Sequence, residues 1–575
     1  MLKRRIVLLM SLYLLIFSVL LGRLFYYQVI KGENISQQAI AMRSQQIELR
    51  EYHRGDILDR NLSSLTSSHS SLALYGLPRV IGQESYYKHN DTDKDANQLV
   101  KDKAYEELAS FLAKMLKDRD EQEILTQLKH EGNNARFIRI NDNLSPAQAE
   151  QINASHLPGL VVAPIINRYR EDGFCAHLLG YASKGEGGEG QAGIEKAYEK
   201  TLRGNPSSQE LVSTLDARGK VIQGLMFKVR EDQRQESAVV LTIDKRIQEV
   251  VENAMDKRIT KGAVVVMDIH NKEILAMASR PTFNPYLVKD IIAFDDRSTL
   301  SNRALSKYNP GSLFKILLSA AALEEGKVNL EEKFFCSGEY VYNEQVTTAC
   351  WKEDGHGSLS FAQAFANSCN PTFIQVGLRL GRTKLLQYVD QMHLTDETII
   401  GYNPGNVGTY VKIAGGNPAL GNACLGQEGV MLSPVQIASL LSTIADDGWW
   451  ASPSLVQYTI DQNGQKEMLP KGERQQVITT STAEKVKQLL EKVVEEGTGK
   501  PAAIPEARVA GKTATSQTGR MKSADEEILN PWFAGYFPAD QPRYAIVVMA
   551  EEGSSGAESC APVFKDISRG MLKFF

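Results

Sequence analysis

The 575-residue sequence has few cysteines and almost no net charge. Six cysteines in a chain of this length are too few for a disulfide-dense scaffold, and none falls in a C-x-x-C pair, which argues against a zinc site. A formal net charge of -4, with no run of like charges, gives no basis for nucleic-acid binding. What the sequence does have is length and 42% hydrophobic residues, enough for two or three domains with cores of their own.

Long apolar runs are also scarce, and the one at the N-terminus is therefore informative. Basic residues at positions 3–5 precede an apolar stretch from Ile6 to Ile30, longer than the roughly 20 residues that a membrane span needs. The alternative is a cleaved signal peptide, but bulky residues 24–27 stand where a small-x-small cleavage site belongs. We expect residues 1–30 to be a single-pass anchor with a cytoplasmic N-terminus and an exported remainder.

The stretch that follows predicts a non-catalytic part of the chain. Residues 31–53 are polar and suggest a stem leaving the membrane. Residues 54–236 mix short strand-like runs with helices at about 101–117 and 144–152, where apolar residues recur at helical spacing. The pattern predicts an α+β pedestal without a catalytic cluster.

From Ser237 onward the pattern is that of a larger α/β domain, residues 237–575. A strand at 238–243 is followed by a helix that Asp244 caps, and two β-rich runs at 262–269 and 273–278 suggest a hairpin. Near the end, strands are expected at 508–516, 532–537 and 544–550, followed by a closing helix at 562–575. Strands at both ends of a helical middle predict a sheet packed with helices, in which the last strands return beside the first.

The strongest chemical signal is Ser312, three residues before Lys315 in the segment N-P-G-S-L-F-K. The segment runs into an almost wholly apolar helix, so Ser312 is expected at the N-terminus of a buried helix, where free N–H groups favour negative charge. Lys315 is expected to reach the Ser312 hydroxyl, and burial would lower its pKa enough for it to act as a base. The alternative is that Ser312 only caps the helix and that Lys315 follows it by chance.

Two further pairs of residues are weak signals when each is taken alone. Ser368 and Asn370 flank one residue on a predicted turn between helices, where ordinary capping is the simpler explanation. Lys512 and Thr513 lie in a predicted strand, which could be a solvated edge strand. In this order, however, S-x-x-K, S-x-N and K-T-x resemble the active site of penicillin-binding proteins and serine β-lactamases.

Other segments make the resemblance more specific. Residues 54–60, of the form R-G-x-x-x-D-R, and residues 193–198 resemble the pedestal motifs of class B penicillin-binding proteins. No segment resembles the glycosyltransferase domain of class A. The chain is thus identified as a member of the class B family, monofunctional D,D-transpeptidases of the elongation, division or sporulation type. Ala514 departs from the family, which usually has glycine there.

The resemblance implies a mechanism and a set of partners. Ser312 would attack the D-Ala-D-Ala end of a peptidoglycan stem peptide, and β-lactams would trap the same serine. Partners would be a membrane glycosyltransferase of the shape, elongation, division and sporulation type and other wall-synthesis proteins, without a metal or organic cofactor. The residues implied in catalysis are Ser312, Lys315, Ser368, Asn370 and Lys512; those implied in substrate binding are Thr513, Ala514 and Thr515, with the oxyanion held by the N–H groups of Ser312 and Thr515.

Several alternatives stay open at this point. A β-lactamase or β-lactam sensor shares the three motifs, and a D,D-carboxypeptidase differs only in using water as acceptor. A structural wall-synthesis protein with a degenerate site is a further alternative, and only Ala514 favours it. Cys336 and Cys350, close in an exported domain, could form a disulfide or remain buried free thiols.

Overall fold

The structure is a computed structural model in which the contacts divide the chain into two compact units. One unit comprises residues 1–53, 69–167 and 206–234, and the other comprises 54–68, 168–205 and 235–575. Residues 54–68 and 168–205, assigned to the pedestal from the sequence, thus pack with the C-terminal part. The described residues are 2–32, 35, 46–47, 54–66, 69–78, 81, 94–116, 119–132, 137–155, 157, 159–183, 188–203, 210–212, 228–230, 237–294, 297–395, 398–403, 410–523 and 526–574.

The N-terminal apolar stretch forms a helix, α1 (Leu2–Phe25), that continues into a π-helical turn, η1 (Tyr26–Ile30). Within the described residues it is the one helix long and apolar enough to cross a membrane, and its apolar side chains are exposed. A single-pass membrane anchor is consistent with this helix. The predicted stem, residues 31–53, lies almost wholly outside the described residues.

The first unit contains a small antiparallel sheet covered by helices. Its strand order is β4 (Ile138–Leu144), β3 (His69–Gly76), β5 (Leu160–Asn167). Apolar residues of α4 (Lys94–Met115), α5 (Glu121–Glu131) and α6 (Pro146–Ser155) pack with β3 and β4 in one core. A second sheet orders β1 (Gln46–Ile47), β6 (Glu210–Val212) and β7 (Lys228–Arg230). The predicted α+β character is confirmed.

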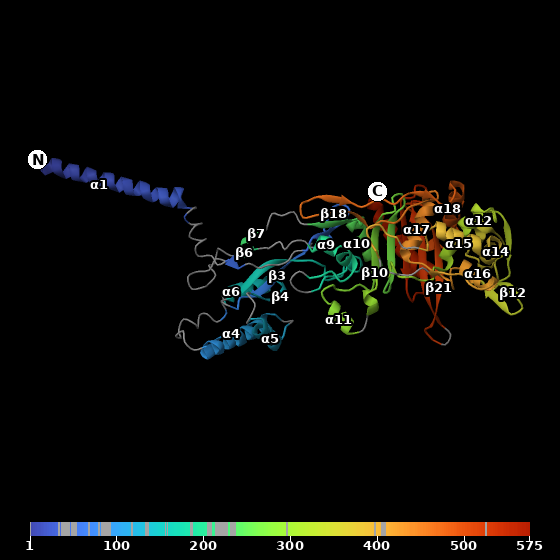
Figure 1. Ribbon diagram of the computed structural model, residues 1–575, viewed down its shortest axis with the longest axis horizontal. Helices are drawn as coiled ribbons and strands as arrows, with labels where there is room; N and C mark the ends of the chain where they lie inside the picture. The colour runs from blue at the N-terminus through green and yellow to red at the C-terminus, as the bar shows by residue number, and fades with distance from the viewer. Residues whose placement is uncertain are drawn as a thin grey trace. The chain divides into compact units, whose positions relative to one another are not determined.

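The second unit is organised around a five-stranded antiparallel sheet (Figure 1). Its order is β10 (Ile274–Arg280), β9 (Gly262–Asp268), β23 (Tyr544–Ala550), β22 (Glu527–Phe537) and β21 (Ala510–Met521). β23 pairs along its whole length with β9. The last strands therefore return beside the first, as the sequence predicts, and β21 is left at one edge.

Alternating side chains of this sheet bury against helices on both faces, because successive residues of a strand point to opposite sides. Val264, Val266 and Phe533 share a core with α10 (Lys245–Asp256) and α19 (Ala561–Met571). Val265 and Ala534 belong to a larger core on the other face. That core includes α12 (Phe314–Glu324), α14 (Asn370–Leu380), α17 (Pro434–Ala445) and α18 (Thr480–Glu495).

A four-stranded sheet in the same unit contains the segment of residues 54–60. β2 (Asp56–Leu58) pairs in parallel with β8 (Ala238–Leu241), which pairs with β18 (Val456–Ile460), and β19 (Lys466–Met468) completes the order. The predicted cap of α10 is present, since the Asp244 carboxylate accepts from the N–H of Arg246 at 3.0 Å.

Candidate active site

Ser312 lies in a short 3-10 turn, η3 (Gly311–Leu313), that leads directly into α12. Gly311 has φ 54°, a left-handed conformation suited to glycine, and its N–H donates to the Gly426 carbonyl at 2.9 Å. A Cβ on Gly426 would lie 2.1 Å from the Gly311 oxygen. The close contact of two backbones therefore fixes the turn and leaves Ser312 partly buried at the start of an apolar helix.

Lys315 is fully buried and connects Ser312 to the turn at Ser368. Its Nζ donates to the Ser368 carbonyl at 2.9 Å, to Asn370 Oδ1 at 2.8 Å and to Ser368 Oγ at 3.3 Å. Ser368 Oγ in turn donates to Ser312 Oγ at 2.8 Å. The sequence predicts a direct contact between Lys315 and Ser312; in the structure the path runs through the Ser368 hydroxyl, which lies between the two.

The turn that carries Ser368 follows α13 (Phe361–Ala366) and precedes α14, whose first residue is Asn370. Ser368 has φ 56°, which is uncommon for a residue with a side chain. Its neighbours hold this conformation, since the Cys369 N–H donates to the Ala364 carbonyl at 2.9 Å. The turn presents the Ser368 hydroxyl and the Asn370 amide on one side of Lys315.

Lys512 is a second buried amine, placed by β21. It donates to the Thr513 carbonyl at 3.0 Å, and its Nζ lies 5.8 Å from the centroid of the Phe365 ring. The Thr513 hydroxyl is hydrogen bonded to that of Thr498. Thr498 lies in the segment G-T-G-K (residues 497–500), outside the three motifs that predict the site, so its place beside Thr513 could not be predicted from them.

The two amines share an unusual electrostatic environment. Burial lowers the pKa of Lys315 to about 8. Burial also lowers the pKa of Lys512 well below its usual value, and the charge of Lys315 adds to this effect. Within the described residues neither amine forms an ion pair with a carboxylate. A ligand with a carboxylate would therefore supply a charge that the site lacks.

Ala514 and Thr515 continue β21 beside the turn that carries Ser312. A Cβ on Gly311 would lie 3.1 Å from the Thr515 carbonyl oxygen and 3.5 Å from the Ala514 methyl. The Thr515 hydroxyl accepts from the N–H of Gly556 at 3.3 Å. The Ala514 side chain is 4% exposed and belongs to the core. The methyl packs inward because β21 lies directly against η3.

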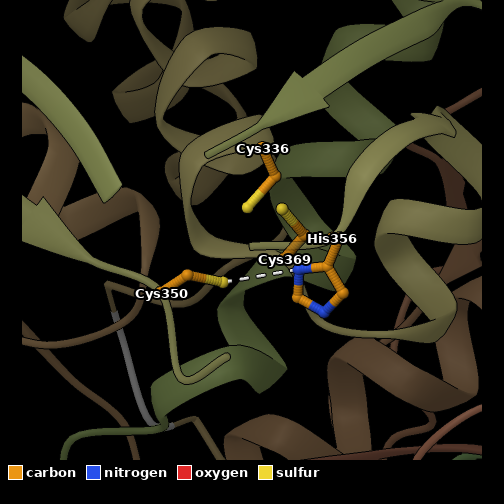
Figure 2. A group of neighbouring side chains, drawn as sticks. All are labelled: Cys336, Cys350, His356 and Cys369. Carbon is orange, nitrogen blue, oxygen red and sulfur yellow. Dashed lines mark hydrogen bonds between the residues drawn. The ribbon is translucent and has the colours of Figure 1, made fainter. Parts of the chain in front are cut away.

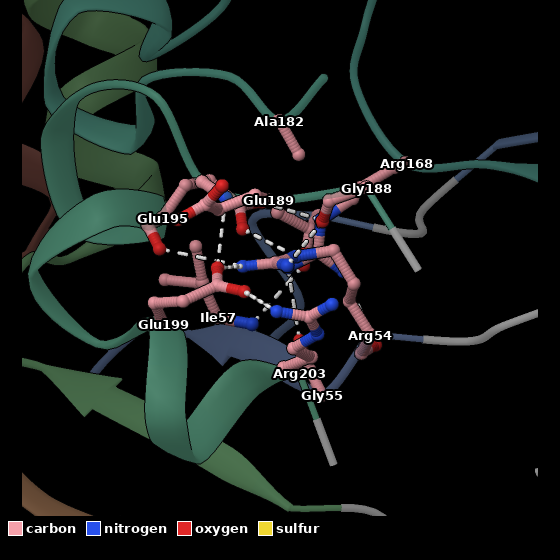
Figure 3. A network of polar contacts seen from close by, with 12 residues as sticks. Arg54, Gly55, Ile57, Arg168, Ala182, Gly188, Glu189, Glu195, Glu199 and Arg203 are labelled. Atoms are coloured by element: carbon pink, nitrogen blue, oxygen red, sulfur yellow. Dashed lines mark hydrogen bonds and ion pairs between the residues drawn. The ribbon is translucent and has the colours of Figure 1, made fainter. Parts of the chain in front are cut away.

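The two segments that resemble pedestal motifs meet in a buried polar network (Figure 3). Arg54 Nε donates to Glu195 Oε2 at 2.9 Å, and its other nitrogens reach Glu199 Oε2 at 2.7 Å and the Gly188 carbonyl at 2.6 Å. Arg168 also forms an ion pair with Glu195, which is fully buried. Both carboxylates therefore pair with arginines, as a structural network requires.

Comparisons with known proteins match almost the whole chain. The family model of the penicillin-binding protein transpeptidase domain matches residues 262–569, and that of the penicillin-binding protein dimerisation domain matches residues 50–233. Stage V sporulation protein D of Bacillus subtilis is 28% identical, with 99% of this chain and 85% of the relative covered. Peptidoglycan D,D-transpeptidase FtsI of Escherichia coli K12 is 25% identical, with 99% and 91% covered.

Solved structures show the same fold. The D,D-transpeptidase domain of a peptidoglycan glycosyltransferase from Eggerthella lenta aligns with a TM-score of 0.57 and 27% identity, over 72% of this chain and 93% of that one. Penicillin-binding protein 3 of Mycobacterium tuberculosis aligns with a TM-score of 0.60 and 22% identity, over 91% and 96%.

Proposed function

Since the chain belongs to the class B penicillin-binding protein family, we propose that Ser312 is the nucleophile of its transpeptidase reaction. The protein is a peptidoglycan D,D-transpeptidase, which acts on stem peptides and binds β-lactams. The observation that carries the assignment is the hydrogen-bonded series Ser312, Ser368, Lys315 and Asn370 at the start of a buried helix.

The series provides a route for the protons of acyl transfer. Ser312 Oγ attacks the carbonyl carbon of the penultimate D-Ala, and its proton passes through the Ser368 hydroxyl to the Lys315 amine. The tetrahedral intermediate collapses when the bond to the terminal D-Ala nitrogen breaks; that nitrogen takes a proton from Ser368, which recovers one from Lys315. An amine of a second stem peptide then attacks the ester carbonyl, its proton passes to Lys315, and Ser312 Oγ regains a proton through Ser368 as the ester bond breaks and the cross-link forms.

The remaining residues bind and orient the donor peptide. Lys512 and the Thr513 hydroxyl bind its terminal carboxylate, which favours the charged form of the buried amine. The N–H groups of Ser312 and Thr515 form the oxyanion hole, where each donor contributes about 2.7–4 kcal/mol to transition-state stabilisation. The inward position of Ala514 leaves the strand backbone free to pair with the peptide.

The experiment is labelling of the full chain in detergent with a fluorescent penicillin, followed by mass spectrometry of the labelled peptide. Ser312→Ala is expected to abolish labelling, because it removes the attacking oxygen. Ser319→Ala is the matched control in the same helix: its hydroxyl donates to the Lys315 carbonyl at 2.7 Å and takes no part in the reaction. Labelling that persists in the Ser312 variant would refute the assignment.

The lifetime of the penicillin adduct, together with a transfer assay that uses a stem peptide and an acceptor amine, distinguishes the alternative functions. A transpeptidase keeps the acyl group until an amine arrives, whereas a β-lactamase releases it quickly to water. A D,D-carboxypeptidase would transfer a stem peptide to water even when an acceptor amine is present. A degenerate protein would form no covalent adduct.

We propose that α1 anchors the protein once, with its N-terminus in the cytoplasm and the rest outside, because the basic residues 3–5 precede the span. In the division proposed from the sequence, residues 54–236 recruit partners, among them a membrane glycosyltransferase, and residues 237–575 catalyse. Protease added outside intact spheroplasts is expected to cleave the chain beyond residue 30. Complete protection would refute this orientation.

A further inference from the structure

Three thiols and one imidazole converge next to the Ser368 turn (Figure 2). Cys336, Cys350, His356 and Cys369 each offer one ligand atom, and these atoms all lie within 4.8 Å of one another. Cys350 Sγ lies 3.6 Å from His356 Nδ1. The three cysteines are at most 4% exposed and are free thiols in the structure.

The fold brings these residues together from separate elements. β11 (Lys333–Cys336) pairs with β14 (Gly357–Ser360), so that Cys336 lies opposite the residue after His356. Cys350 follows β13 (Val346–Ala349), and its N–H donates to the Gly338 carbonyl at 2.7 Å. Cys369 is the N-cap residue of α14.

The loops around the cluster approach one another so closely that two of their positions require glycine. Gly338 and Gly355 have φ of 105° and 72°. A Cβ on Gly338 would lie 2.0 Å from the Glu353 oxygen, and one on Gly355 would lie 2.3 Å from the Cys336 oxygen. The two glycines therefore allow the loops to pack closely around the sulfur atoms, which fixes the positions of the four side chains.

We propose that these four side chains bind one structural Zn²⁺ ion. Three thiolates and an imidazole form a Cys₃His set, and four protein ligands complete a tetrahedral shell with no position left for substrate. With Zn–S of about 2.3 Å and Zn–N of about 2.0–2.1 Å, a tetrahedral ion holds sulfur and nitrogen about 3.6 Å apart. The Cys350–His356 contact already has this separation.

A disulfide explains the cluster less well than an ion does. A bond between Cys336 and Cys350 would use two of the sulfurs. It would not explain why the ligand atoms of Cys369 and His356 lie within 4.8 Å of them. Soft thiolates with an imidazole favour zinc over the oxygen-seeking cations Mg²⁺ and Ca²⁺. The absence of a C-x-x-C pair, from which the sequence argued against zinc, reflects only that the ligands come from separate strands and loops.

The ion would position the catalytic turn. Cys369 stands between Ser368 and Asn370, so a bond to its sulfur restrains the backbone that holds both side chains. On the other side of the cluster, Asn370 Nδ2 donates at 3.1 Å to the carbonyl of Ala349, which precedes Cys350. Cys350 and Cys369 are thus positioning residues, whereas zinc binding itself does not depend on the proposed acyl transfer.

The test is the zinc content of the full chain, purified in detergent without chelator and measured by inductively coupled plasma mass spectrometry. We expect about one Zn²⁺ per chain in the native protein and less than about a tenth of that in Cys336→Ser. Cys560→Ala is the matched control, because Cys560 is an equally buried free thiol outside the cluster. It should keep the full zinc content.

A second measurement covers the case in which Cys336→Ser does not fold. Cobalt(II) added to native protein stripped with a chelator should give thiolate-to-cobalt charge-transfer and tetrahedral d–d bands that zinc abolishes. Stripping should also lower the Tm, and zinc alone should restore it. A native protein without zinc or tetrahedral cobalt bands, a Cys336–Cys350 disulfide in peptide maps, or equal zinc in Cys336→Ser would overturn the proposal.

Discussion

Two buried polar networks in this protein differ in charge balance. At Glu195, each arginine faces a carboxylate: Arg54 contacts Glu195 at 2.9 Å and Glu199 at 2.7 Å, and Arg168 pairs with Glu195. At Ser312, the two buried lysines face carbonyl oxygens, an amide and aromatic rings. One network neutralises its charges, and the other does not.

The difference in charge balance decides whether a buried group stays charged: the carboxylate of the balanced network keeps its charge, whereas the amine of the unbalanced network loses its proton more easily. Burial is the largest single effect on the Glu199 carboxyl and would raise its pKa. The hydrogen bonds from Arg54 and the Gly190 N–H, together with the charge of Arg54, outweigh burial, and the pKa is lowered. Near Ser312 nothing outweighs burial, and the pKa of Lys315 falls to about 8. A balanced network holds the chain together without reactivity, whereas an unbalanced one keeps an amine available as a base.

The largest effect is expected from removing the unbalanced amine. Lys315→Met keeps much of the shape of the side chain but removes the base, so acylation by penicillin should slow by about a hundredfold to ten-thousandfold. The Tm should change little, because removing a buried amine offsets the loss of its hydrogen bonds to Ser368 and Asn370. Stopped-flow acylation and thermal unfolding measure the two. A near-normal acylation rate would show that Lys315 is not the base.

Breaking the balanced network should affect stability and not chemistry. Glu195→Ala leaves Arg54 and Arg168 without their shared carboxylate and should destabilise the fold by about 3–5 kcal/mol, seen as a lower Tm. The folded protein should still be acylated at close to the native rate. Arg203→Ala is the control, since this exposed residue lies 3.8 Å from Glu199 and should cost at most about 1 kcal/mol. Equal Tm values for the two variants would contradict the comparison.

The smallest effect is expected at Ala514, next to the unbalanced network. Ala514→Gly removes a buried methyl from a strand interior and should destabilise the protein by about 0.5–1 kcal/mol. Acylation by a compact penicillin and by a bulky cephalosporin should change by the same small factor, because the methyl packs toward Gly311. A selective gain for the cephalosporin, measured as second-order rate constants, would show that ligands touch this methyl.

Features encoded locally could be predicted from the sequence. The apolar run around Ser312 predicts a buried helix, and the Asp244 cap and the hairpin of β9 and β10 follow from neighbouring residues. The pairing of β23 with β9 follows from topology rules that hold for many sheets. The site residues were found because their motifs resemble a family, and the structure joins four of them, Ser312, Lys315, Ser368 and Asn370, in one hydrogen-bonded series.

Contacts between distant segments could not be predicted. Both Arg54 and Glu195 lie in recognised motifs, yet nothing in either segment indicates that the two side chains meet. The same holds for Thr498 beside Thr513 and for the cysteine cluster, which strand pairing and tight loops assemble. The path from Lys315 to Ser312 runs through Ser368 because Ser368 has a left-handed backbone conformation. The residue type of Ser368 does not predict that conformation.

The contact between the backbones of Gly311 and Gly426 limits how such a protein can evolve antibiotic resistance. Any side chain at Gly426 would displace the turn that holds Ser312, the proposed nucleophile. Because β-lactams and stem peptides are both proposed to react at Ser312, moving this turn should reduce acylation and transpeptidation together. Resistance substitutions are expected at more tolerant positions on the approach to the site, such as the exposed Gln517 further along β21.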